Sequence, residues 1–286
     1  MRIKKLFTIF AAIATLSASA QADRDPQTGR EPQAGDIVRQ GNSIYYLVRV
    51  FSTPEQNAAF QRDIDIMRRH ATAIDKCKLR IKEITDAEKT FEKDPKKLEA
   101  LAADKTRISS AFDKLVKDFS TNEEAMKKLY GFVSNRDYRI TYDESNICVS
   151  ITKEELSELK SKDGKKLDPL KIITRGNTSL YILKNISGAR ANEELQRMLG
   201  FSISRKNEID KLRTELAGTV DPQAQLKISA NISAAEKAMQ SNEEKLRQKY
   251  GIDKNQNYTV EISKSKMYLV ITPEEERELR AKFGGK

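Results

Sequence analysis

Few residues in this chain could catalyse a reaction. The single histidine, His70, is flanked by Arg68 and Arg69 and has no neighbouring nucleophile or orienting carboxylate motif of the kind a catalytic triad requires. No second histidine or cysteine stands at metal-ligand spacing, and Gly284-Gly285 is a tail and not a phosphate-binding loop. We therefore expect no catalytic, cofactor-binding or metal-binding residue, no cofactor and no enzyme activity.

Two pairs of adjacent glutamates, each of which recurs later in the chain, could also carry chemistry. Paired carboxylates can act as acid and base, but acids in the first turn of a helix also complement its dipole and cap its free N–H groups. The capping role accounts for them, and we predict helix-start positions for all four. The pairs are Glu123-Glu124, Glu154-Glu155, Glu243-Glu244 and Glu274-Glu275.

The two cysteines, Cys77 and Cys148, raise the question of a disulfide. Cys77 follows Thr53, the expected start of a long helix, by 24 residues, which is about 35 Å along a helix axis. Cys148 falls in a strand pattern at the base of that helix. A disulfide needs Cα atoms within about 7 Å, so we predict no bond between them within the chain.

The first 22 residues have the pattern of a secretory signal peptide. Arg2, Lys4 and Lys5 precede an apolar run, Leu6–Leu16, and Ala20-Gln21-Ala22 fits the small-residue cleavage rule. Eleven residues are too few to span a hydrocarbon core about 30 Å thick. We expect cleavage after Ala22, no membrane-spanning segment afterwards, and a periplasmic or secreted product.

Composition argues for long solvated helices. The chain has 286 residues, of which 38% are hydrophobic and 33% charged, with no tryptophan and a net charge of +10. Globular domains average about 45–50% apolar residues, so a thick single core is not expected. Acids alternate with bases along the helical segments, which is typical of solvated helix faces, and a clustered basic patch is missing. Nucleic acid is therefore not an expected partner.

A long internal repeat organises the chain. Asn122–Gly131 reappears as Asn242–Gly251, and the matching positions continue without a gap beyond both segments. At the front, Gly41-Asn42 matches Gly176-Asn177. We predict a tandem duplication with a repeat unit 1 at 37–160 and a repeat unit 2 at 172–282. The remaining segments are a disordered or extended stretch at 23–36, a linker at 161–171 and a tail at 283–286.

The repeats differ in length on both sides of an Asp-Pro pair. Asp94-Pro95 and Asp221-Pro222 mark the middle of the two helical stretches, and the second stretch is shorter by eight residues before the pair and seven after it. Two antiparallel helices must shorten together if they are to stay paired. This predicts helical hairpins, the second shorter by about 10 Å.

Each repeat has the same predicted order of elements. Residues 37–39 and 44–51 form a hairpin, and Thr53-Pro54 begins a helix. Apolar residues recur on a seven-residue frame and predict an antiparallel coiled coil; they are Phe60, Ile64, Met67, Ala71, Ile74, Ile81, Ile84, Leu101, Ile108, Phe112, Leu115, Phe119, Met126 and Leu129.

The end of each repeat is predicted from turn and strand signals. The second helix ends at Tyr130-Gly131, where glycine suits a left-handed cap. Alternation at 138–142 and 147–151 predicts a second hairpin, followed by a short helix at 153–160, or 273–282 in the second repeat. The expected fold is α+β: two ββ–αα–ββ–α units, each a small antiparallel sheet with a projecting coiled-coil helical hairpin.

This combination of features resembles the Skp/OmpH family of periplasmic chaperones. The features that carry the resemblance are the Ala20-Gln21-Ala22 signal end, the first strand, the paired helices, the segment Tyr138–Ile151 and the short helix after it. The resemblance covers each repeat by architecture and order of elements. It implies an ATP-independent chaperone that holds unfolded outer-membrane proteins between its arms.

A second function class fits the same features. The arms of an envelope scaffold or adaptor subunit would be rigid spacers that dock protein partners, and such a protein could be an oligomer. The two hypotheses differ in the arm surface: a chaperone exposes apolar or basic residues there, whereas a spacer is evenly charged.

Overall fold

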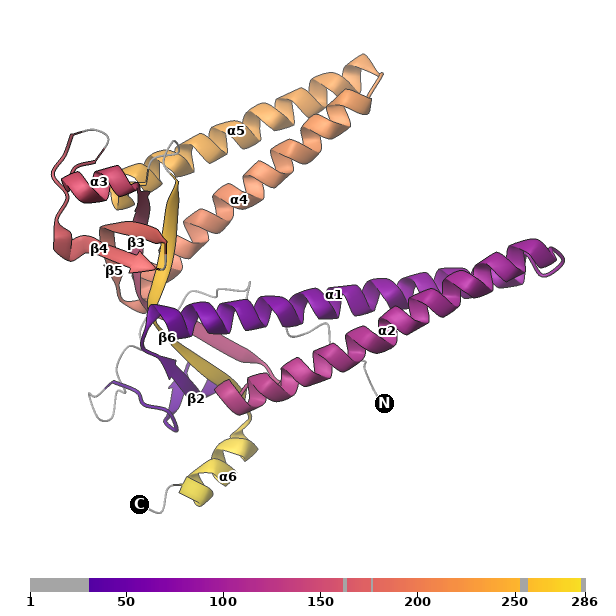
Figure 1. The fold of residues 1–286 in the computed structure, drawn as a ribbon, viewed down its shortest axis with the longest axis horizontal. Helices are drawn as coiled ribbons and strands as arrows, with labels where there is room; N and C mark the ends of the chain where they lie inside the picture. Colours follow the sequence, from indigo (N-terminus) through magenta and orange to yellow (C-terminus); the bar gives the residue numbers. More distant parts are fainter. Residues whose placement is uncertain (1–30, 162–163, 176, 253–256, 284–286) are drawn as a thin grey trace. The chain divides into compact units, whose positions relative to one another are not determined.

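The structure, a computed structural model, describes residues 31–161, 164–175, 177–252 and 257–283. Its fold is α+β, as the sequence predicts (Figure 1). The elements are, in chain order, β1 (Ile37–Gln40), β2 (Ser43–Phe51), α1 (Pro54–Thr90), α2 (Pro95–Tyr130), β3 (Tyr138–Ile151), α3 (Lys153–Glu158), β4 (Ile172–Arg175), β5 (Thr178–Ser187), α4 (Ala189–Gly218), α5 (Pro222–Tyr250), β6 (Tyr258–Ile271) and α6 (Pro273–Phe283). A 3₁₀ turn, Pro169–Lys171, precedes β4. The predicted signal peptide lies outside the described residues.

The strands form one antiparallel sheet in the order β1-β2-β6-β3-β5-β4. The chain nevertheless divides into two compact units, and the two long strands are shared between them. Among the described residues, unit 1 contains 31–140 and 266–283, and unit 2 contains 141–265. Unit 1 thus holds β1, β2, the start of β3 and the end of β6, whereas unit 2 holds β4, β5 and the remaining parts of β3 and β6.

The predicted second hairpin is wrong. Residues Tyr138–Ile151 and Tyr258–Ile271 each form one uninterrupted strand of 14 residues. The segment that looked like a turn pairs instead with β5, from Glu144 opposite Ser187 to Ile147 opposite Lys184, and a bulge follows Ile147. Contacts with the start of α4 therefore override the local turn signal.

Asn192 of α4 supplies those contacts. Its side chain is fully buried and donates to the carbonyl oxygens of Asp143, Ile186 and Gly188, at 3.2, 3.3 and 3.0 Å. The Ser145 hydroxyl donates to its Oδ1. The Asp143 carbonyl and the Ser145 hydroxyl, which could otherwise be solvated in a turn, thus have partners inside unit 2, and this permits an extended strand.

The first hairpin and the helix starts agree with the sequence. Ile37 to Gln40 pair with Tyr46 to Ser43. Thr53 caps α1 by accepting the Gln56 N–H at 3.3 Å, while Gln56 Oε1 accepts the N–H of Ser52 at 2.9 Å. The helices after the Asp-Pro pairs are capped by Asp94 and Asp221.

The α1–α2 pair, here called the first arm, is longer than the α4–α5 pair, the second arm. The helices have 37 and 36 residues in the first arm and 30 and 29 in the second. Seven residues correspond to about 10 Å of helix, so the predicted difference is confirmed. The first arm ends at its base in Gly131, and the second in Gly251, both in the left-handed conformation.

Each unit has its own core at the base of its arm. Phe51, Phe60, Ile64, Met67, Met126, Phe132, Tyr138 and Met267 form the core of unit 1. Ile147, Ile186, Leu195, Leu246, Tyr250 and Ile252 form the core of unit 2. Leu129 departs from the predicted frame, since it is 53% exposed. The neighbouring Tyr130 turns inward instead, 5.1 Å from the Phe60 ring.

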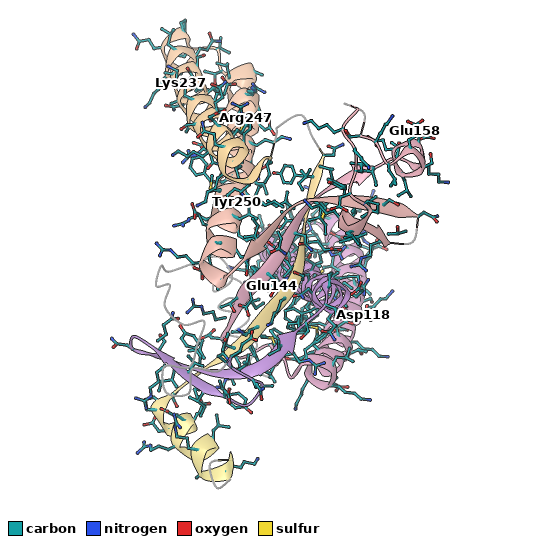
Figure 2. All side chains as sticks on the ribbon, turned by 90° about the vertical axis from the view of Figure 1, so that its left-hand side faces the viewer. Asp118, Glu144, Glu158, Lys237, Arg247 and Tyr250 are labelled. Atoms are coloured by element: carbon teal, nitrogen blue, oxygen red, sulfur yellow. The ribbon has the colours of Figure 1, made fainter. Side chains whose placement is uncertain are left out.

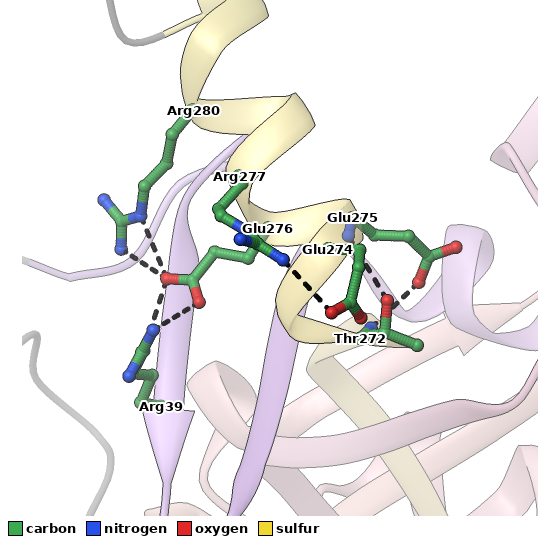
Figure 3. A network of polar contacts seen from close by, with 7 residues as sticks. All are labelled: Arg39, Thr272, Glu274, Glu275, Glu276, Arg277 and Arg280. Atoms are coloured by element: carbon green, nitrogen blue, oxygen red, sulfur yellow. Dashed lines mark hydrogen bonds and ion pairs between the residues drawn. The ribbon is translucent and has the colours of Figure 1, made fainter.

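Polar contacts attach α6 and residues 31–36 to the rest of unit 1. In Figure 3, Arg39 of β1 makes a two-pronged contact with Glu276 of α6, at 2.5 and 3.2 Å, and Arg280 also donates to Glu276. The Arg39 guanidinium lowers the pKa of Glu276, chiefly by hydrogen bonding. Residues 31–36, predicted to be disordered or extended, are ordered by a Gly35 N–H bond to the Leu47 carbonyl and by a turn at Asp36.

Candidate functional site: two unlike helix pairs

The first arm has a charged surface and a polar contact near its middle. Contacts between its helices join Tyr130 to Asp63 at 2.8 Å and Lys105 to Glu88 at 2.6 Å. His70 lies in this seam, where its Nδ1 is 3.2 Å from Asn122 Nδ2. His70 thus contacts an amide side chain between the two helices, and this structural role accounts for its position.

Ion pairs cover much of the remaining surface of the first arm. Most join residues one helical turn apart, and such exposed pairs contribute only about 0–1 kcal/mol each. The pairs are Asp65–Arg68, Asp75–Lys78, Arg80–Glu83, Arg80–Asp104, Asp86–Lys89, Glu88–Lys105, Asp94–Lys97 and Asp104–Arg107. This surface is the evenly charged one expected of a spacer.

The second arm differs most clearly at its tip. Between residues 216 and 228 the only charged side chains are Asp221 and Lys227, and Val220 and Leu226 are 89% and 72% exposed. The tip of the first arm is rich in charge, and its Phe91 ring lies 4.4 Å beneath the Lys97 ammonium. The second tip therefore presents two exposed apolar side chains among fewer charged residues than the first tip has.

Further apolar residues are exposed along α4. Ile203 is 63% exposed and Phe201 is 36% exposed. On the first arm Leu79 is also exposed, but it stands between Lys78 and Arg80, which both form ion pairs. Isolated exposed apolar residues are normal on soluble proteins, whereas neighbouring ones indicate contact surfaces.

The seam of the second arm is interrupted by polar groups. Asn242 donates to the Met198 carbonyl oxygen and to Ser202 Oγ, both at 2.8 Å. The Nε atom of Arg205 is buried without a hydrogen-bond partner among the described residues, although its NH1 bonds Glu208. The Arg205 guanidinium lies 5.1 Å from the centre of the partly exposed Phe201 ring.

The base of the second arm contains a shallow groove of about 300 Å³. It is lined by Glu194 and Met198 of α4 and by Lys245, Gln248 and Lys249 of α5. Lys249 bonds Glu194 at 2.5 Å, and this hydrogen bond lowers the pKa of Glu194. Figure 2 shows Tyr250 where α5 ends at this base, and Arg247 and Lys237 on the same helix toward the tip of the arm.

The glutamate pairs divide into two groups. Glu154-Glu155 and Glu274-Glu275 lie in first helical turns, and Thr152 with Glu155 forms a reciprocal capping box, so the prediction is confirmed for them.

For Glu123-Glu124 and Glu243-Glu244 the capping prediction is wrong, because both pairs lie near the ends of α2 and α5. Glu123 accepts the Ser134 N–H at 3.1 Å and fixes the turn after α2. Glu244 pairs with Arg247. The shared motif at these positions thus stabilises the arm bases.

The cysteines are both free thiols, and they differ in environment. Cys77 is partly exposed on α1, whereas Cys148 is fully buried in β3. Burial, with a smaller contribution from Glu261, raises the pKa of Cys148 to about 11. Such a thiol is protonated at neutral pH and inert.

Within the described ranges, no group of three or more His, Cys, Asp or Glu side chains is placed to hold a metal ion. None of the helices in that part of the chain is long and apolar enough to cross a bilayer. The features that sequence reasoning missed are the exposed apolar tip at Val220 and Leu226 and the groove between α4 and α5. The low charge of 216–228 could have indicated the first, but the groove depends on helix packing.

Searches for relatives identify none. No protein-family model matches the chain, and no curated protein and no solved structure matches it significantly. The function must therefore be argued from the surfaces described above.

Proposed function

We propose that this protein is an exported, non-enzymatic holding protein whose second arm binds apolar segments of unfolded envelope proteins without ATP. The observation that carries the proposal is the bare apolar tip, Val220 and Leu226, on an arm that also exposes Ile203. The signal-peptide pattern and the resemblance to Skp/OmpH chaperones support the same location and the same mode of action.

The finer description of the fold belongs to this proposal. The order ββααβα occurs twice, each second helix starts at Pro after an Asp cap, and each ends at Tyr-Gly. We infer a tandem duplication whose helix pairs are antiparallel coiled coils. Divergence after duplication would then have made the first arm a spacer and the second a contact arm.

The size of the exposed apolar surface fits weak, transient holding. Full burial of one aliphatic side chain contributes about 1.5–3 kcal/mol, so Val220 and Leu226 together supply only a few kcal/mol. Association itself costs at least about 4 kcal/mol. Stable binding therefore needs several contacts along the arm, which an extended unfolded chain provides and a small folded ligand does not.

The competing function is a scaffold or adaptor subunit. The ion-paired surface of the first arm favours it, because such a surface gives a stiff, soluble spacer. A pull-down from envelope extract separates the two: a holding protein brings down many unfolded clients, and a scaffold brings down one stoichiometric partner.

The direct test is suppression of aggregation. The protein at several-fold molar excess should lower the light scattering of a denatured outer-membrane protein on dilution, without ATP. Val220→Ser combined with Leu226→Gln should reduce this suppression at least threefold, because both changes remove exposed apolar surface without touching a core. Leu79→Gln on the first arm is the matched control and should behave like the wild type.

Two results would refute the proposal. Scattering that the wild-type protein leaves unchanged would remove the holding activity and favour the scaffold. Equal loss in the Leu79 control would show that the second tip has no special role.

A further inference from the structure

The third strand of each compact unit comes from the other repeat. In unit 1 the strand order is β1-β2-β6, and in unit 2 it is β4-β5-β3. Strands β1 and β2 belong to the first repeat and β6 to the second, whereas in unit 2 only β3 belongs to the first repeat. The two segments that are exchanged in this way are 141–160, which contains α3, and 266–283, which contains α6.

The core of each unit shows the same exchange. Of the core residues named above, all those of unit 1 come from the first repeat except Met267, and all those of unit 2 come from the second except Ile147. Both exceptions are fully buried. They are also equivalent, because each stands 25 positions after the asparagine that begins the repeated motif, Asn122 or Asn242. Each repeat thus completes the core of the other unit with the same position.

Charged side chains hold the second exchanged segment, 266–283, in unit 1. Lys266 and Glu276 are each only 3% exposed. Lys266 is paired with Glu31 at 3.3 Å, and Glu276 with Arg39 at 2.5 Å, as Figure 3 shows for the latter. Burying a charge is costly unless it is paired. The first repeat supplies these partners, so the two buried charges of the segment are matched to the unit that holds them.

Neutral polar groups hold the first exchanged segment, 141–160, in unit 2. The Gly188 N–H donates to the Asp143 carbonyl at 2.7 Å, and the Asn185 amide donates to Asn146 Oδ1 at 3.0 Å. Backbone pairing with β5 continues from there to Ile151. The segment is therefore bound by the second repeat along most of its strand.

The two exchanged segments are not interchangeable. Leu156 stands where the second segment has Glu276, and Thr174 of β4 stands where β1 has Arg39. If each repeat kept its own segment, Leu156 would face Arg39, and the Glu276 carboxylate would face Thr174. The charge pair would then be lost, so the side chains favour exchange over two self-contained repeats.

The turn pattern at 143–146 describes the alternative arrangement. A hairpin there, which the sequence predicts, would fold residues 147–160 back onto the first repeat. In the structure the segment is extended and carries those residues into unit 2. Domain swapping has this form, in which an identical element is exchanged between two partners through a hinge.

We propose that the two repeats form a strand-exchanged pair, in which each repeat binds the C-terminal strand and helix of the other. The linker at 161–171 is then not needed to hold the repeats together. It lies within unit 2, where the Leu167 N–H donates to the Leu159 carbonyl at 2.7 Å. This inference rests on the tandem duplication proposed above and does not depend on the holding of clients.

The first test cuts the linker of the mature chain. A site for a sequence-specific protease is inserted after Gly164, where an added Cβ would meet nothing within 4 Å. Cleavage produces the fragments 23–164 and 165–286. On size-exclusion chromatography at about micromolar concentration, they should elute as one species with one copy of each fragment. The uncut protein, which should elute at the same volume, is the reference.

The second test locates the exchanged strand with a disulfide. Cys148 of β3 stands opposite Ile182 of β5, and opposite Cα atoms on antiparallel strands are about 4.5–5.5 Å apart, which is within disulfide range. Ile182→Cys, in a chain that also carries Cys77→Ser, should form this bond during oxidative refolding. Because the bond joins the two fragments, the cleaved and denatured protein should run as one band without reductant and as two with it.

Leu47→Cys, again with Cys77→Ser, is the matched control. Leu47 follows Gly41 by six positions, as Ile182 follows Gly176, so the two residues are equivalent. Position 47 would face Cys148 only if the first repeat kept its own strand. In the exchanged pair this variant should form no disulfide, and its fragments should separate on a denaturing gel with or without reductant.

Three results would overturn the proposal. Elution of the native fragments as two separate species would show that the linker holds the repeats together. A disulfide within the first fragment of the Leu47→Cys variant would show that the first repeat keeps its own strand. An Ile182→Cys protein whose bond joins two chains, with twice the mass, would place the exchange between molecules. No client protein is present in these tests, so their failure is separate from failure of the light-scattering test.

Discussion

Cys77 and Cys148 show how strongly the surroundings of one residue type set its reactivity. Cys148 has a pKa raised to about 11 and no exposed surface, whereas Cys77 lies partly exposed on a helix. A rise of about two units lowers the thiolate fraction about 100-fold near pH 8, and burial blocks the reagent as well. The two thiols are therefore kinetically distinct.

We predict that iodoacetamide modifies Cys77 and spares Cys148 in the native protein at pH 8. Intact mass should show one added group under native conditions and two after denaturation without reductant. Two groups on the native protein would mean that β3 opens readily. None after denaturation would reveal a disulfide and contradict the free thiols.

Asn122 and Asn242, at equivalent positions of the two repeats, have similar structural roles. Asn122 and Asn242 begin the shared segments, and both point into the seam of their arm, toward His70 in one case and toward Met198 and Ser202 in the other. A polar group in an apolar seam fixes the register of paired helices at some cost in stability. The motif therefore has a structural meaning that does not require chemistry.

At the scale of elements, the helix ends at Gly131 and Gly251 have the same backbone conformation in different surroundings. Both glycines have left-handed backbones, with φ of 73° and 71°. A Cβ added at Gly131 would stand 2.8 Å from Val48 Cγ1 of β2, whereas one added at Gly251 would meet nothing within 4 Å. The same substitution thus combines backbone strain with a clash in one unit and produces strain alone in the other.

We predict that Gly251→Ala costs about 1 kcal/mol of unfolding free energy, because left-handed backbone disfavours alanine. Gly131→Ala should cost about 2–4 kcal/mol, since overpacking against Val48 adds to the strain. Denaturant unfolding followed by circular dichroism measures both. Equal costs in the two variants would mean that β2 shifts to admit the methyl group.

At the scale of the whole molecule, the division into compact units does not follow the order of residues in the chain. Residues 266–283 follow unit 2 in sequence but belong to unit 1. Met267 is fully buried in the unit 1 core, and Glu276 is held by Arg39 of β1. The C-terminal segment is therefore a structural part of the unit that begins more than 200 residues earlier.

We predict that removing residues 266–286 destabilises the first arm more than the second. Amide hydrogen exchange should show lost protection in α1 and α2 near their bases, with α4 and α5 largely retained. Glu276→Gln, which weakens only the contacts of residue 276 with Arg39 and Arg280, serves as the mild control and should affect α6 alone. Loss confined to α4 and α5 would assign the segment to unit 2.

The sequence by itself determined the local elements and their lengths. Caps at Thr53 and Asp94, the glycine at 131 and the difference in arm length could be predicted because each depends on a short stretch of chain or on simple helix geometry. The capping role of Glu154-Glu155 was predictable for the same reason.

Tertiary structure decided how those elements are used. The pattern at residues 143–146 favours a turn, yet Asn192, almost 50 positions later, hydrogen-bonds with the Asp143 carbonyl and the Ser145 hydroxyl within an extended β3. The same holds for Glu123, which accepts the Ser134 N–H after α2 instead of capping the start of a helix. A local pattern reports what a segment favours alone, whereas a buried hydrogen bond or its absence depends on which distant residue packing brings beside it.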